Sequence, residues 1–513
     1  MMAVDIRPAV VTNLREVIQA IDQLPTRVEH VTASSRDARP GTMFLAYPGA
    51  ARDGRSFIDD AVIRGASAVM YESAGDFQWN DAWRVPHVAV TDLKQFASAI
   101  GAHVYGHPSN PLWMVGVTGT NGKTSVSQWI AQSLEMAGRR SAVLGTIGNG
   151  LVGALTTSDN TTPDAIVLQR YLREFVNAGA TTCAMEVSSH GLDQGRVADV
   201  KYDVAVFTNL TRDHLDYHGT MEAYGEAKAK LFALRGLKAA VVNVDDAFGR
   251  ELASRAERRG VEVIRYATKA GARFANLIAH NIAVTSAGLS FTVQSLDANG
   301  LTTDEAEVES DILGAFNASN LLAVIGCLKT SGIAIAAAAS IVGKLASVTG
   351  RMQKVRATVN PANKPLVVVD YAHTPDALEK VLSTIAAIVP DKGRLISVFG
   401  CGGDRDSGKR PLMGAISGRY ADFTILTSDN PRTEDPAKIL ADIEAGFGQA
   451  PHHTVIDRRQ AIFEALDRAV ATDVVVIAGK GHEDYQIIGE TKHHFSDVEV
   501  ALEALRVWKG RPE

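Results

Sequence analysis

The fold is decided by the stretch LWMVGVTGTNGKT at residues 112–124. Its apolar first half predicts a β-strand, and the glycine turn after it leads into a helical pattern of apolar residues that begins at Val126. A strand, a glycine-rich turn and a helix N-terminus in this order are typical of a phosphate-binding loop, because successive backbone N–H groups and the helix dipole favour anionic oxygens. We predict an ATP-type nucleotide site here, in which Lys123 adds positive charge and Thr124 offers a hydroxyl to magnesium.

The spacing of this loop departs from the common pattern. The pattern G-x-x-x-x-G-K-[ST] would require glycine at position 117, where the chain has Val117, and the nearest glycines are Gly116 and Gly119. The alternative is an ordinary helix start with a solvated lysine at Lys123, but it does not explain the apolar strand before the loop. The physical context therefore favours a nucleotide site.

Composition and charge narrow the class of protein. A length of 513 residues predicts about three domains, and 46% hydrophobic with 21% charged residues is ordinary for a globular protein. The net charge of −6, without a basic block, argues against a nucleic-acid partner. Cys183, Cys327 and Cys401 are too scattered for a disulfide framework or a metal quartet, which fits a reducing cytoplasm. We find no signal peptide, and the most apolar stretch, 333–342, is too short to span a bilayer, so we expect a cytoplasmic protein without membrane insertion.

The chain is expected to divide into three regions, at residues 1–110, 111–345 and 346–513. Residues 107–111, His-Pro-Ser-Asn-Pro, have the composition of a linker. Strand-like runs occur in all three regions and alternate with helical patterns in the second and third, at 42–46, 67–71, 87–90, 182–187, 203–209, 239–244, 366–370, 395–399, 423–427 and 474–478. This alternation predicts an α/β fold with doubly wound, mostly parallel sheets, in which ligands bind beyond the carboxyl ends of the strands.

Polar clusters follow the predicted strands of the second and third regions. They lie at residues 186–190, 209–214, 370–373, 400–405, 428–432 and 479–483. One such cluster alone is more often an ordinary loop. Six at the same topological place predict one composite site between two sheets.

Two of these clusters suggest a metal site. Glu186 and His214 follow different strands of the nucleotide region, so they could converge near Thr124. Magnesium prefers oxygen ligands, which makes histidine an unusual ligand and leaves a role outside the metal site open for His214. The neighbouring Asp213 and Asp216 favour the metal role somewhat.

Lys228 lies at an unexpected place in its helical pattern. On a helix over residues 224–232 it falls on the apolar face with Tyr224, while Glu226 and Lys230 are spaced to pair on the other side. A lysine on a buried face must reach solvent with its head group, pair, lose its proton or be modified. Two interpretations stay open, a head group that extends to water and an N-carbamate formed with CO₂.

Taken together, these motifs resemble the Mur ligases, in order and over nearly the whole chain. The matching segments are GTNGKT at 119–124, NTTP at 160–163, MEVSSH at 185–190, DHLDYHG at 213–219, DYAHTP at 370–375, GCGGDRD at 400–406 and GKGHED at 479–484. The variant phosphate loop is the form that this family has. The resemblance implies a smaller N-terminal α/β domain that binds a UDP-linked substrate, a central ATP-binding domain with the phosphate loop, and a C-terminal Rossmann-like domain that binds an amino acid.

The resemblance also implies a reaction. ATP and Mg²⁺ phosphorylate the γ-carboxylate of D-glutamate in UDP-N-acetylmuramoyl-L-Ala-D-Glu, and an amine of meso-2,6-diaminopimelate attacks the acyl phosphate to form an amide during peptidoglycan precursor synthesis. A ligase of the same pathway that adds L-lysine is the nearest alternative, differing chiefly at 429–432. A folylpolyglutamate synthase is disfavoured by that segment and by the first domain, and a nucleotide-binding switch would explain only the loop. We expect the enzyme to act as a monomer.

Residue roles carry over from the matching motifs. Catalytic roles fall to Lys123, Glu186, His214 and Lys228, the last as N6-carboxylysine. Metal ligands would be Thr124, Glu186, His214 and the carbamate of Lys228. Contacts to ATP fall to Gly119, Thr120, Asn121, Gly122, Lys123, Thr124, Asn317, Asn320, Arg351 and His373. The UDP-linked substrate would be held by Ser35, Arg36, Thr161, Thr162, Ser188, Gln194 and Arg196. Diaminopimelate would be bound by Arg405, Asp429, Asn430, Arg432, Gly479 and Glu483.

Arg432 is the residue on which amino-acid specificity is expected to depend. Diaminopimelate differs from lysine by a carboxylate at its far end, and a planar guanidinium reads a carboxylate through two parallel hydrogen bonds. On spacing alone, a surface turn with a solvated arginine remains open. The family match favours recognition by Arg432, with Asn430 beside it and Glu483 placed to accept from the distal ammonium.

Overall fold

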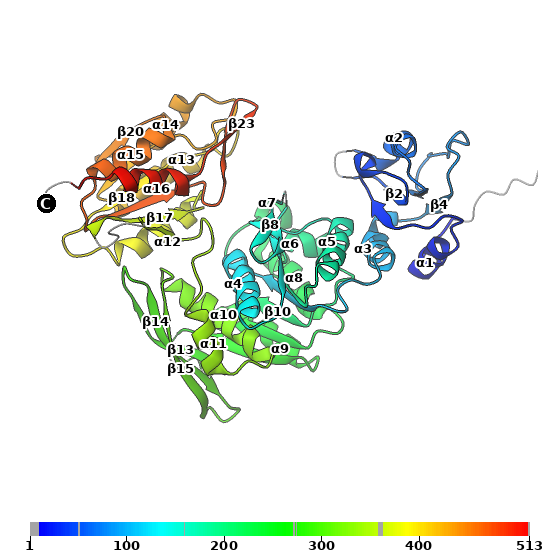
Figure 1. Ribbon diagram of the computed structural model, residues 1–513, viewed down its shortest axis with the longest axis horizontal. Coiled ribbons are helices and arrows are strands. Elements are labelled where there is room, and N and C mark those ends of the chain that lie inside the picture. Colours follow the sequence, from blue (N-terminus) through cyan, green and yellow to red (C-terminus); the bar gives the residue numbers. More distant parts are fainter. Residues whose placement is uncertain are drawn as a thin grey trace, which may run out of the picture. The chain divides into compact units, whose positions relative to one another are not determined.

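The computed structural model describes residues 10–49, 52–158, 160–269, 272, 274–357 and 363–510. The chain forms two compact units. Figure 1 labels their helices and strands. The first unit comprises Met1–Tyr266, Arg273–Ala275 and Gly326–Gly332, and the second comprises Ala267–Ala272, Asn276–Ile325 and Ile333–Glu513.

The first unit begins with a four-stranded parallel sheet in the order β1-β2-β3-β4. Its strands are β1 (His30–Thr32), β2 (Thr42–Ala46), β3 (Ala68–Glu72) and β4 (His87–Val90). Helices α1 (Leu14–Asp22) and α3 (Leu93–Val104) pack in the core on one face, and α2 (Ile58–Ile63) packs on the other. Because both faces are covered, β2 and β3 are buried along their length, which explains why the sequence shows them as nearly continuous apolar runs.

A larger, mainly parallel sheet follows, with the strand order β12-β11-β10-β5-β9-β6-β7-β8. The parallel strands are β5 (Trp113–Thr118), β6 (Ser141–Gly145), β9 (Thr182–Glu186), β10 (Val204–Phe207), β11 (Ala239–Asn243) and β12 (Glu262–Ala267). Strands β7 (Gly148–Leu151) and β8 (Ala154–Thr156) pair antiparallel. Strand β5 lies between β10 and β9, so the loop after β5 emerges in the middle of the carboxyl edge of the sheet.

Helices and short turns connect these strands. They are α4 (Lys123–Met136), α5 (Ala165–Asn177), α6 (Ser189–Asp193), α7 (Leu215–His218), α8 (Met221–Ala229), the 3₁₀ turn η3 (Lys230–Ala233) and α9 (Ala247–Glu257). Asp164 and Asp246 cap α5 and α9, since each side chain accepts hydrogen bonds from N–H groups of the first turn. The polar residues before the apolar helical patterns thus fix where these helices begin.

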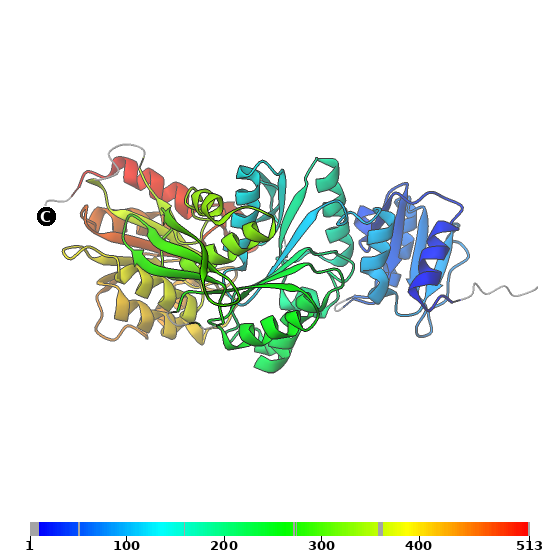
Figure 2. The ribbon, with the colours of Figure 1, turned by 90° about the horizontal axis from the view of Figure 1, so that it is seen from below.

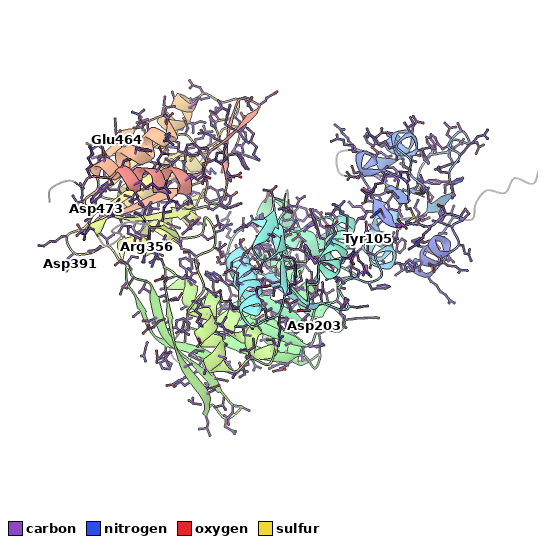
Figure 3. All side chains as sticks on the ribbon, in the orientation of Figure 1. Tyr105, Asp203, Arg356, Asp391, Glu464 and Asp473 are labelled. Carbon is purple, nitrogen blue, oxygen red and sulfur yellow. The ribbon has the colours of Figure 1, made fainter. Side chains whose placement is uncertain are left out.

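Two polar anchors hold elements of the first unit together, and Figure 3 labels both. The carboxylate of Asp203 accepts a hydrogen bond from Met114 N at 2.9 Å and pairs with Lys238 Nζ at 2.8 Å. The carbonyl of Tyr105, which follows α3, accepts from Arg173 Nε of α5 at 2.7 Å. Asp203 therefore sets the start of β5 beside the start of β10, and Tyr105 joins α3 to α5.

The second unit opens with strands that the sequence did not predict. β13 (Leu277–Val284), β14 (Leu289–Leu296) and β15 (Thr302–Ser310) pair antiparallel and are followed by α10 (Phe316–Thr330) and α11 (Ile335–Val342). Most side chains of β15 are exposed or half-buried, and the strand contains four acidic residues. It therefore shows no apolar run of the kind that marks a strand buried on both faces.

The rest of the second unit is a doubly wound sheet in the order β16-β17-β21-β18-β19-β20. Its strands are β16 (Gln353–Val355), β17 (Leu366–Asp370), β18 (Leu395–Phe399), β19 (Phe423–Leu426), β20 (His452–Thr454) and β21 (Val474–Ala478), and β16 alone among these pairs antiparallel. One face packs on α12 (Pro375–Ala386), α13 (Lys409–Tyr420) and α14 (Pro436–Glu444). The other packs on α15 (Arg458–Arg468) and α16 (Asp497–Val507), seen as separate layers in Figure 2. A hairpin of β22 (Tyr485–Ile488) and β23 (Thr491–His494) lies between β21 and α16 in the chain.

The predicted fold class is confirmed. The structure is α/β, with a mainly parallel large sheet and separate smaller sheets. Cys183, Cys327 and Cys401 are buried and unpaired. In the part of the chain that the structure describes, no helix combines the length and the apolar character that crossing a membrane requires.

Candidate active site

The loop after β5 is held in place by the end of β10. Thr120 N donates to Asn209 O at 2.8 Å, and Asn121 N donates to Asn209 Oδ1 at 3.0 Å. Gly119 has φ +149°, and a Cβ there would lie 1.9 Å from Thr208 Oγ1. The loop therefore passes too close to β10 for any residue except glycine at this position.

Lys123 and Thr124 begin α4 and point to different partners. Lys123 Nζ donates to the carbonyls of Gly119 and Thr120 at 3.0 and 2.8 Å, so its charge lies within the loop. Thr124 Oγ1 donates to Glu186 Oε2 at 2.9 Å. The predicted cation and the predicted magnesium hydroxyl thus both lie at a helix N-terminus, where the dipole adds positive potential.

Glu186 is the buried acidic centre of this region, with 1% of its surface exposed. Besides Thr124, its carboxylate accepts from Thr146 N at 2.7 Å and from Thr146 Oγ1 at 3.2 Å. Thr146 was not predicted from the sequence. It follows β6 in the chain as the predicted polar clusters follow their own strands, and the same rule would have found it.

The predicted residues for the UDP-linked substrate in the larger sheet form one bonded group beside Glu186. Thr161 Oγ1 lies 3.0 Å from Thr146 Oγ1, and Thr162 Oγ1 donates to the carbonyl of Glu186 at 3.0 Å. Ser188 N in turn donates to Thr162 Oγ1, and Arg196 Nη1 donates to Thr162 O at 2.8 Å. Arg196 also holds Gln194 Oε1 at 2.7 Å.

The remaining pair of this group, Ser35 and Arg36, lies on the 3₁₀ turn η1 (Ser35–Asp37) of the four-stranded sheet domain. Ser35 is buried. A hydrogen bond from Ser35, followed by one from Arg64, lowers the pKa of Asp60, and the charge of Arg36 acts in the same direction. The contacts found for this pair are local, and its role at the substrate stays a prediction.

Lys228 is buried as its helical face predicted, with 1% of its surface exposed. Its Nζ donates to Gly119 O at 2.9 Å and lies 4.1 Å from the centre of the Tyr224 ring. Burial, and then the charge of Lys123, lower the pKa of Lys228 well below its usual value, against the opposing effect of Asp213. The head group does not extend to solvent, so that interpretation is wrong for this lysine.

The pairing expected between Glu226 and Lys230 is also wrong. Glu226 pairs with Arg255 at 2.7 Å, and Lys230 pairs with Asp193 at 2.7 Å. Helix α8 ends at Ala229 and gives way to η3, so the two side chains no longer follow one α-helical face. Partners from other elements replace the local pair.

His214 belongs to a group of aromatic side chains that includes Tyr224, whose ring Lys228 contacts. The φ of His214 is +51°, and its ring is 4.9 Å from that of His190 and 6.0 Å from that of Tyr224. Burial raises the pKa of Tyr224 to about 12. Among the described residues no cluster of three or more His, Cys, Asp or Glu side chains could hold a metal. The predicted ligand set differs from such a cluster, because two of its four ligands are a threonine hydroxyl and a lysine carbamate.

In the second unit, two of the predicted ATP residues meet at Tyr371. The guanidinium of Arg351 lies 4.8 Å from the ring centre, and His373 Nδ1 lies 2.9 Å from Tyr371 O. His482, which the sequence placed in the polar cluster 479–483 without an individual role, has its ring 5.0 Å from the same tyrosine, and burial followed by Arg351 lowers its pKa to about 4. Burial also lowers the pKa of His373, so this group combines one permanent cation with two imidazoles that favour the neutral form.

The other two predicted ATP residues, Asn317 and Asn320, lie on α10. Both are buried, and Asn320 Nδ2 donates to Asn317 Oδ1 at 2.8 Å. Asn317 Nδ2 donates to Leu313 O at 2.7 Å. The two amides therefore orient each other, and their contact with a nucleotide stays a prediction.

The predicted amino-acid pocket is largely assembled in the second unit. Asn430 Nδ2 donates to Glu483 Oε2 at 3.0 Å. A Cβ on Gly479, whose φ is +115°, would lie 3.1 Å from Asp429 Oδ2. Arg405 is exposed, and a Cβ on Gly402 would lie 3.8 Å from Arg405 Cγ and 3.1 Å from Arg432 Nη1. Five of the six predicted residues, Arg432 included, thus follow β19 and β21 at one edge of the sheet.

Arg432 has an unusual backbone conformation. Its φ is +51°, a left-handed value that costs a residue with a side chain about 1–2 kcal/mol. Three contacts hold it there: Arg432 N donates to Ile487 O at 3.1 Å, Gly489 N donates to Arg432 O at 2.7 Å, and Arg432 Nη1 donates to Gly403 O at 2.8 Å. Strain of this kind is typical of functional positions. Here the backbone and the guanidinium of Arg432 are both held by hydrogen bonds, so the direction of the side chain is fixed.

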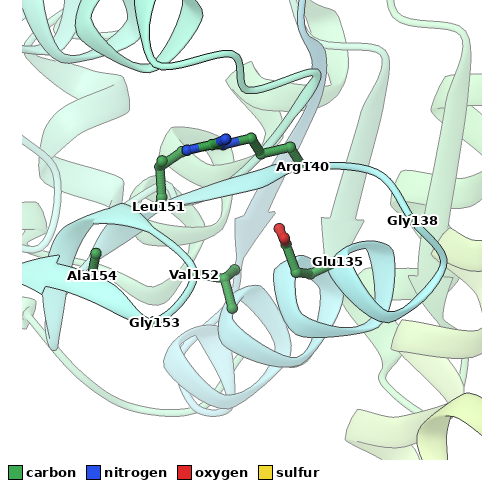
Figure 4. Close-up of a pocket in the computed structure, with 7 residues that line it drawn as sticks. All are labelled: Glu135, Gly138, Arg140, Leu151, Val152, Gly153 and Ala154. Carbon is green, nitrogen blue, oxygen red and sulfur yellow. The ribbon is translucent and has the colours of Figure 1, made fainter.

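Two cavities lie away from these residues. One of about 400 Å³, drawn in Figure 4, lies between the C-terminal end of α4 and the β7–β8 hairpin and is lined by Glu135, Gly138, Arg140, Leu151, Val152, Gly153 and Ala154. Since the phosphate loop is at the opposite end of α4, about 20 Å of helix separates the two. The other, of about 430 Å³, is in the second unit and includes Arg356, Lys364 and Asp473. Neither is lined by a predicted site residue.

Comparisons with known proteins agree with the motif order. The Mur ligase family catalytic domain matches residues 27–105, the Mur ligase middle domain matches 117–328, and the Mur ligase glutamate ligase domain matches 350–481. The chain is 48% identical over 492 residues to the UDP-N-acetylmuramoyl-L-alanyl-D-glutamate–2,6-diaminopimelate ligase of Chromobacterium violaceum, covering 96% of this chain and 97% of that protein.

Solved structures of Mur ligases also match this chain over nearly its whole length. The solved structure of a UDP-N-acetylmuramoyl-L-alanyl-D-glutamate–2,6-diaminopimelate ligase has a sequence 39% identical to this chain. The two structures match with a TM-score of 0.68, over 93% of this chain and 95% of that one. A MurF ligase of Thermotoga maritima, solved with ADP, shares the fold at 18% identity with a TM-score of 0.64, covering 94% and 97%. Identity and domain order both extend over nearly the whole length, and the chain belongs to the Mur ligase family.

Proposed function

We propose that the chain is an ATP-dependent ligase that joins meso-2,6-diaminopimelate to the γ-carboxylate of D-glutamate in UDP-N-acetylmuramoyl-L-Ala-D-Glu, in peptidoglycan precursor synthesis. Relatives at 48% and 39% identity are named for this reaction. The structural observation that carries the proposal is the bond from Thr124 to Glu186, because it joins the ATP loop to the bonded group of Thr161, Thr162 and Ser188. An acceptor carboxylate bound by that group would lie beside the phosphate loop.

The first chemical step is transfer of the γ-phosphoryl group of ATP to the acceptor carboxylate. Two anions must approach each other, so the chain has to supply positive charge where negative charge accumulates. Lys123 and the N–H groups at the start of α4 are the groups placed to do this. The amine of the amino acid then attacks the acyl carbon, loses its proton, and expels inorganic phosphate as the amide forms.

Magnesium fits the oxygen donors next to the phosphate loop. Thr124 Oγ1 and Glu186 Oε2 lie 2.9 Å apart, and hydroxyl and carboxylate oxygens are ligands that Mg²⁺ prefers. We expect these two, with His214 and a carbamylated Lys228, to hold the ion. When bound, Mg²⁺ neutralises charge on the phosphates and on the acyl acceptor.

Lys228 has the surroundings that carbamylation needs. Only a neutral amine attacks CO₂, forming the N–C bond of a carbamate and releasing one proton. The burial and the neighbouring Lys123 that lower the pKa of Lys228 also favour that neutral amine. The product carries a negative charge beside Lys123, in place of a second positive charge.

Recognition of the amino acid is assigned to the pocket after β19 and β21. Arg432 is proposed to bind the carboxylate that diaminopimelate has and lysine lacks, with Asn430 beside it. Asp429 and Glu483 supply negative charge for an ammonium group, and Gly479 and Arg405 complete the pocket. An L-lysine-adding ligase of the same pathway is the main competing proposal.

Domain roles follow from the same assignment. We infer a UDP-substrate domain at residues 1–110, an ATP domain at 111–345 and an amino-acid domain at 346–513. The cytoplasmic location and a monomeric state belong to this proposal as expectations.

The deciding experiment is a panel of amino acids with the purified protein, ATP, Mg²⁺ and UDP-N-acetylmuramoyl-L-Ala-D-Glu. Release of inorganic phosphate and the mass of the product are measured together. We expect release only when both the peptide nucleotide and meso-diaminopimelate are present. Release with the nucleotide alone would indicate an ATPase, and preference for L-lysine would indicate the competing ligase.

A further inference from the structure

Lys480 is the most deeply buried charged side chain next to the amino-acid pocket, with 0% of its surface exposed. It follows Gly479 at the end of β21. Its Nζ lies 3.4 Å from Asp429 Oδ1, 3.1 Å from Asn430 Oδ1 and 3.2 Å from Glu483 Oε2. An ammonium has three donor hydrogens, and here it has three acceptor oxygens.

Burial on this scale is tolerated only because of these partners. Moving an ammonium out of water costs several kcal/mol unless charges and hydrogen bonds compensate it. Lys480 has two carboxylates and one amide oxygen around it, from segments that follow two different strands. Removing the lysine would leave Asp429 and Glu483 as like charges in a largely buried place.

Lys480 also decides which way Asn430 faces. Lys480 Nζ and Ile487 N, which lies 2.9 Å from Asn430 Oδ1, can only donate hydrogen bonds. The amide oxygen must therefore face both of them, which turns the Asn430 NH₂ group toward Glu483. The buried cation and the backbone N–H of Ile487 thus together fix the orientation of the amide and, through it, of the second carboxylate.

The charge of this group leaves a place for one more cation. Two carboxylates and one ammonium sum to −1. Among the described residues, both hydrogen bonds to the Glu483 side chain end on Oε2, which leaves Oε1 for a ligand. An amino acid brings an ammonium group that would balance the remaining charge.

A neighbouring buried cation has a different arrangement. Arg458 pairs with Asp497 through two bonds of 2.7 Å and donates to the carbonyls of Ser428 and Ala478 at 3.3 and 2.9 Å. It holds the backbone where β19 and β21 end. Lys480 instead contacts the side chains of Asp429, Asn430 and Glu483, which are assigned to the amino-acid pocket.

We propose that Lys480 is a positioning residue of the amino-acid pocket, whose ammonium holds Asp429, Asn430 and Glu483 in the arrangement that receives the ammonium group of the incoming amino acid. This inference rests on the proposed function. It assigns to Lys480 an effect on the binding of the amino acid and none on the transfer of phosphate from ATP.

The test measures KM for each of the three substrates and kcat in Lys480→Met and Lys480→Arg. Since a hydrogen bond to a charged group contributes about 1.5–3 kcal/mol, we expect KM for diaminopimelate to rise by roughly 10- to 150-fold in Lys480→Met. KM for ATP and for the peptide nucleotide should stay unchanged. Lys480→Arg keeps the charge but not the geometry, and should raise KM for diaminopimelate by an intermediate factor.

Lys492→Met is the matched control. Lys492 is exposed on β23, and its Nζ lies 3.6 Å from the ring centre of Tyr485, the same ring that Lys480 approaches at 5.5 Å. Its loss should leave all three KM values unchanged.

The outcomes separate the two proposals. If no amino acid supports phosphate release by the unmodified enzyme, the proposed function fails and the inference fails with it. If the unmodified enzyme is active, an unchanged KM for diaminopimelate in folded Lys480→Met, or a parallel rise of all three KM values, overturns the role of Lys480. Should Lys480→Met not fold, an unchanged KM in Lys480→Arg overturns it instead.

Discussion

One buried lysine, Lys228, lies beside the nucleotide loop and another, Lys480, lies beside the amino-acid pocket, and the two lysines have opposite surroundings. Lys228 contacts a carbonyl and the face of a tyrosine, near a second lysine. Lys480 contacts two carboxylates and an amide oxygen. Burial alone therefore does not define what a lysine does. Without a carboxylate partner it tends to a neutral amine that can react, and with two it is a fixed cation that orders its neighbours.

The largest expected effect lies in the amino-acid pocket. Sites built to bond a group that the competitor lacks can discriminate by roughly 10⁴-fold, so we expect about this preference in kcat/KM for meso-diaminopimelate over L-lysine. Arg432→Ala should remove most of it, by lowering kcat/KM for diaminopimelate. Competition assays with both amino acids measure the ratio. Similar kcat/KM values in the unmodified enzyme would show that the pocket does not read the distal carboxylate.

On the nucleotide side, the strongest test concerns the reactive lysine. Replacing Lys228 with Ala removes both the amine and its proposed carbamate, and we expect turnover to fall about 10³-fold, the upper range for one electrostatic contact. Acetate or propionate should restore part of the activity by supplying a carboxylate in the space left. Circular dichroism checks that the variant is folded. Full activity of Lys228→Ala would remove the distinction between the two lysines.

A smaller loss of activity is expected from replacing Lys123, which lies at the end of the phosphate loop. Lys123→Ala removes one positive charge from the transferring phosphoryl group and should lower kcat by about 100-fold. Single-turnover measurement of ADP formation isolates this step. Near-normal turnover in a folded variant would contradict the assignment of the loop.

The smallest effects are on stability, and they should have opposite signs. Lys228→Met removes an uncompensated buried amine and should stabilise the protein by about 1–2 kcal/mol at pH 7.5, whereas Lys480→Met leaves two carboxylates unpaired and should destabilise it by about 3 kcal/mol. Denaturant unfolding in CO₂-depleted buffer measures both.

The pH dependence of the Lys228 effect follows from its lowered pKa. Below the pKa of an unfolded lysine, about 10.4, the unfolded state binds a proton that the folded state does not, so this group makes the unmodified protein more stable as pH rises. The advantage of Lys228→Met should therefore shrink between pH 7.5 and pH 10. A constant difference would show that Lys228 is not deprotonated by folding.

Much of the fold could be predicted because strands buried on both faces are apolar along their whole length. The run at 366–370 corresponds to β17 residue for residue. Strand β15 could not be found in this way, because it is largely exposed and rich in acidic residues. The burial of Lys228 was predictable from helical period, but the partners of Glu226 and Lys230 were not, since they come from other elements.

The site shows the same limit. Residues placed by a local motif, such as Lys123 and Thr124, are visible in the sequence. Lys480 is part of the polar cluster at 479–483, but the sequence assigned this lysine no role of its own, and two of its partners are about fifty positions away in the chain. Only the folded sheet brings the ends of β19 and β21 together.

Position 119 has a consequence for sequence variation. A side chain there would overlap Thr208 Oγ1, and the carbonyl of Gly119 already serves both Lys123 and Lys228. By contrast, a Cβ added to Gly138, two residues after the end of α4, would meet no atom within 4 Å, and only its φ of +81° disfavours a side chain there. Substitution at Gly119 should therefore be opposed by direct overlap with Thr208, whereas substitution at Gly138 should be opposed by backbone strain alone. An inhibitor that relies on the shape of the loop at Gly119 would leave the enzyme little room to acquire resistance there.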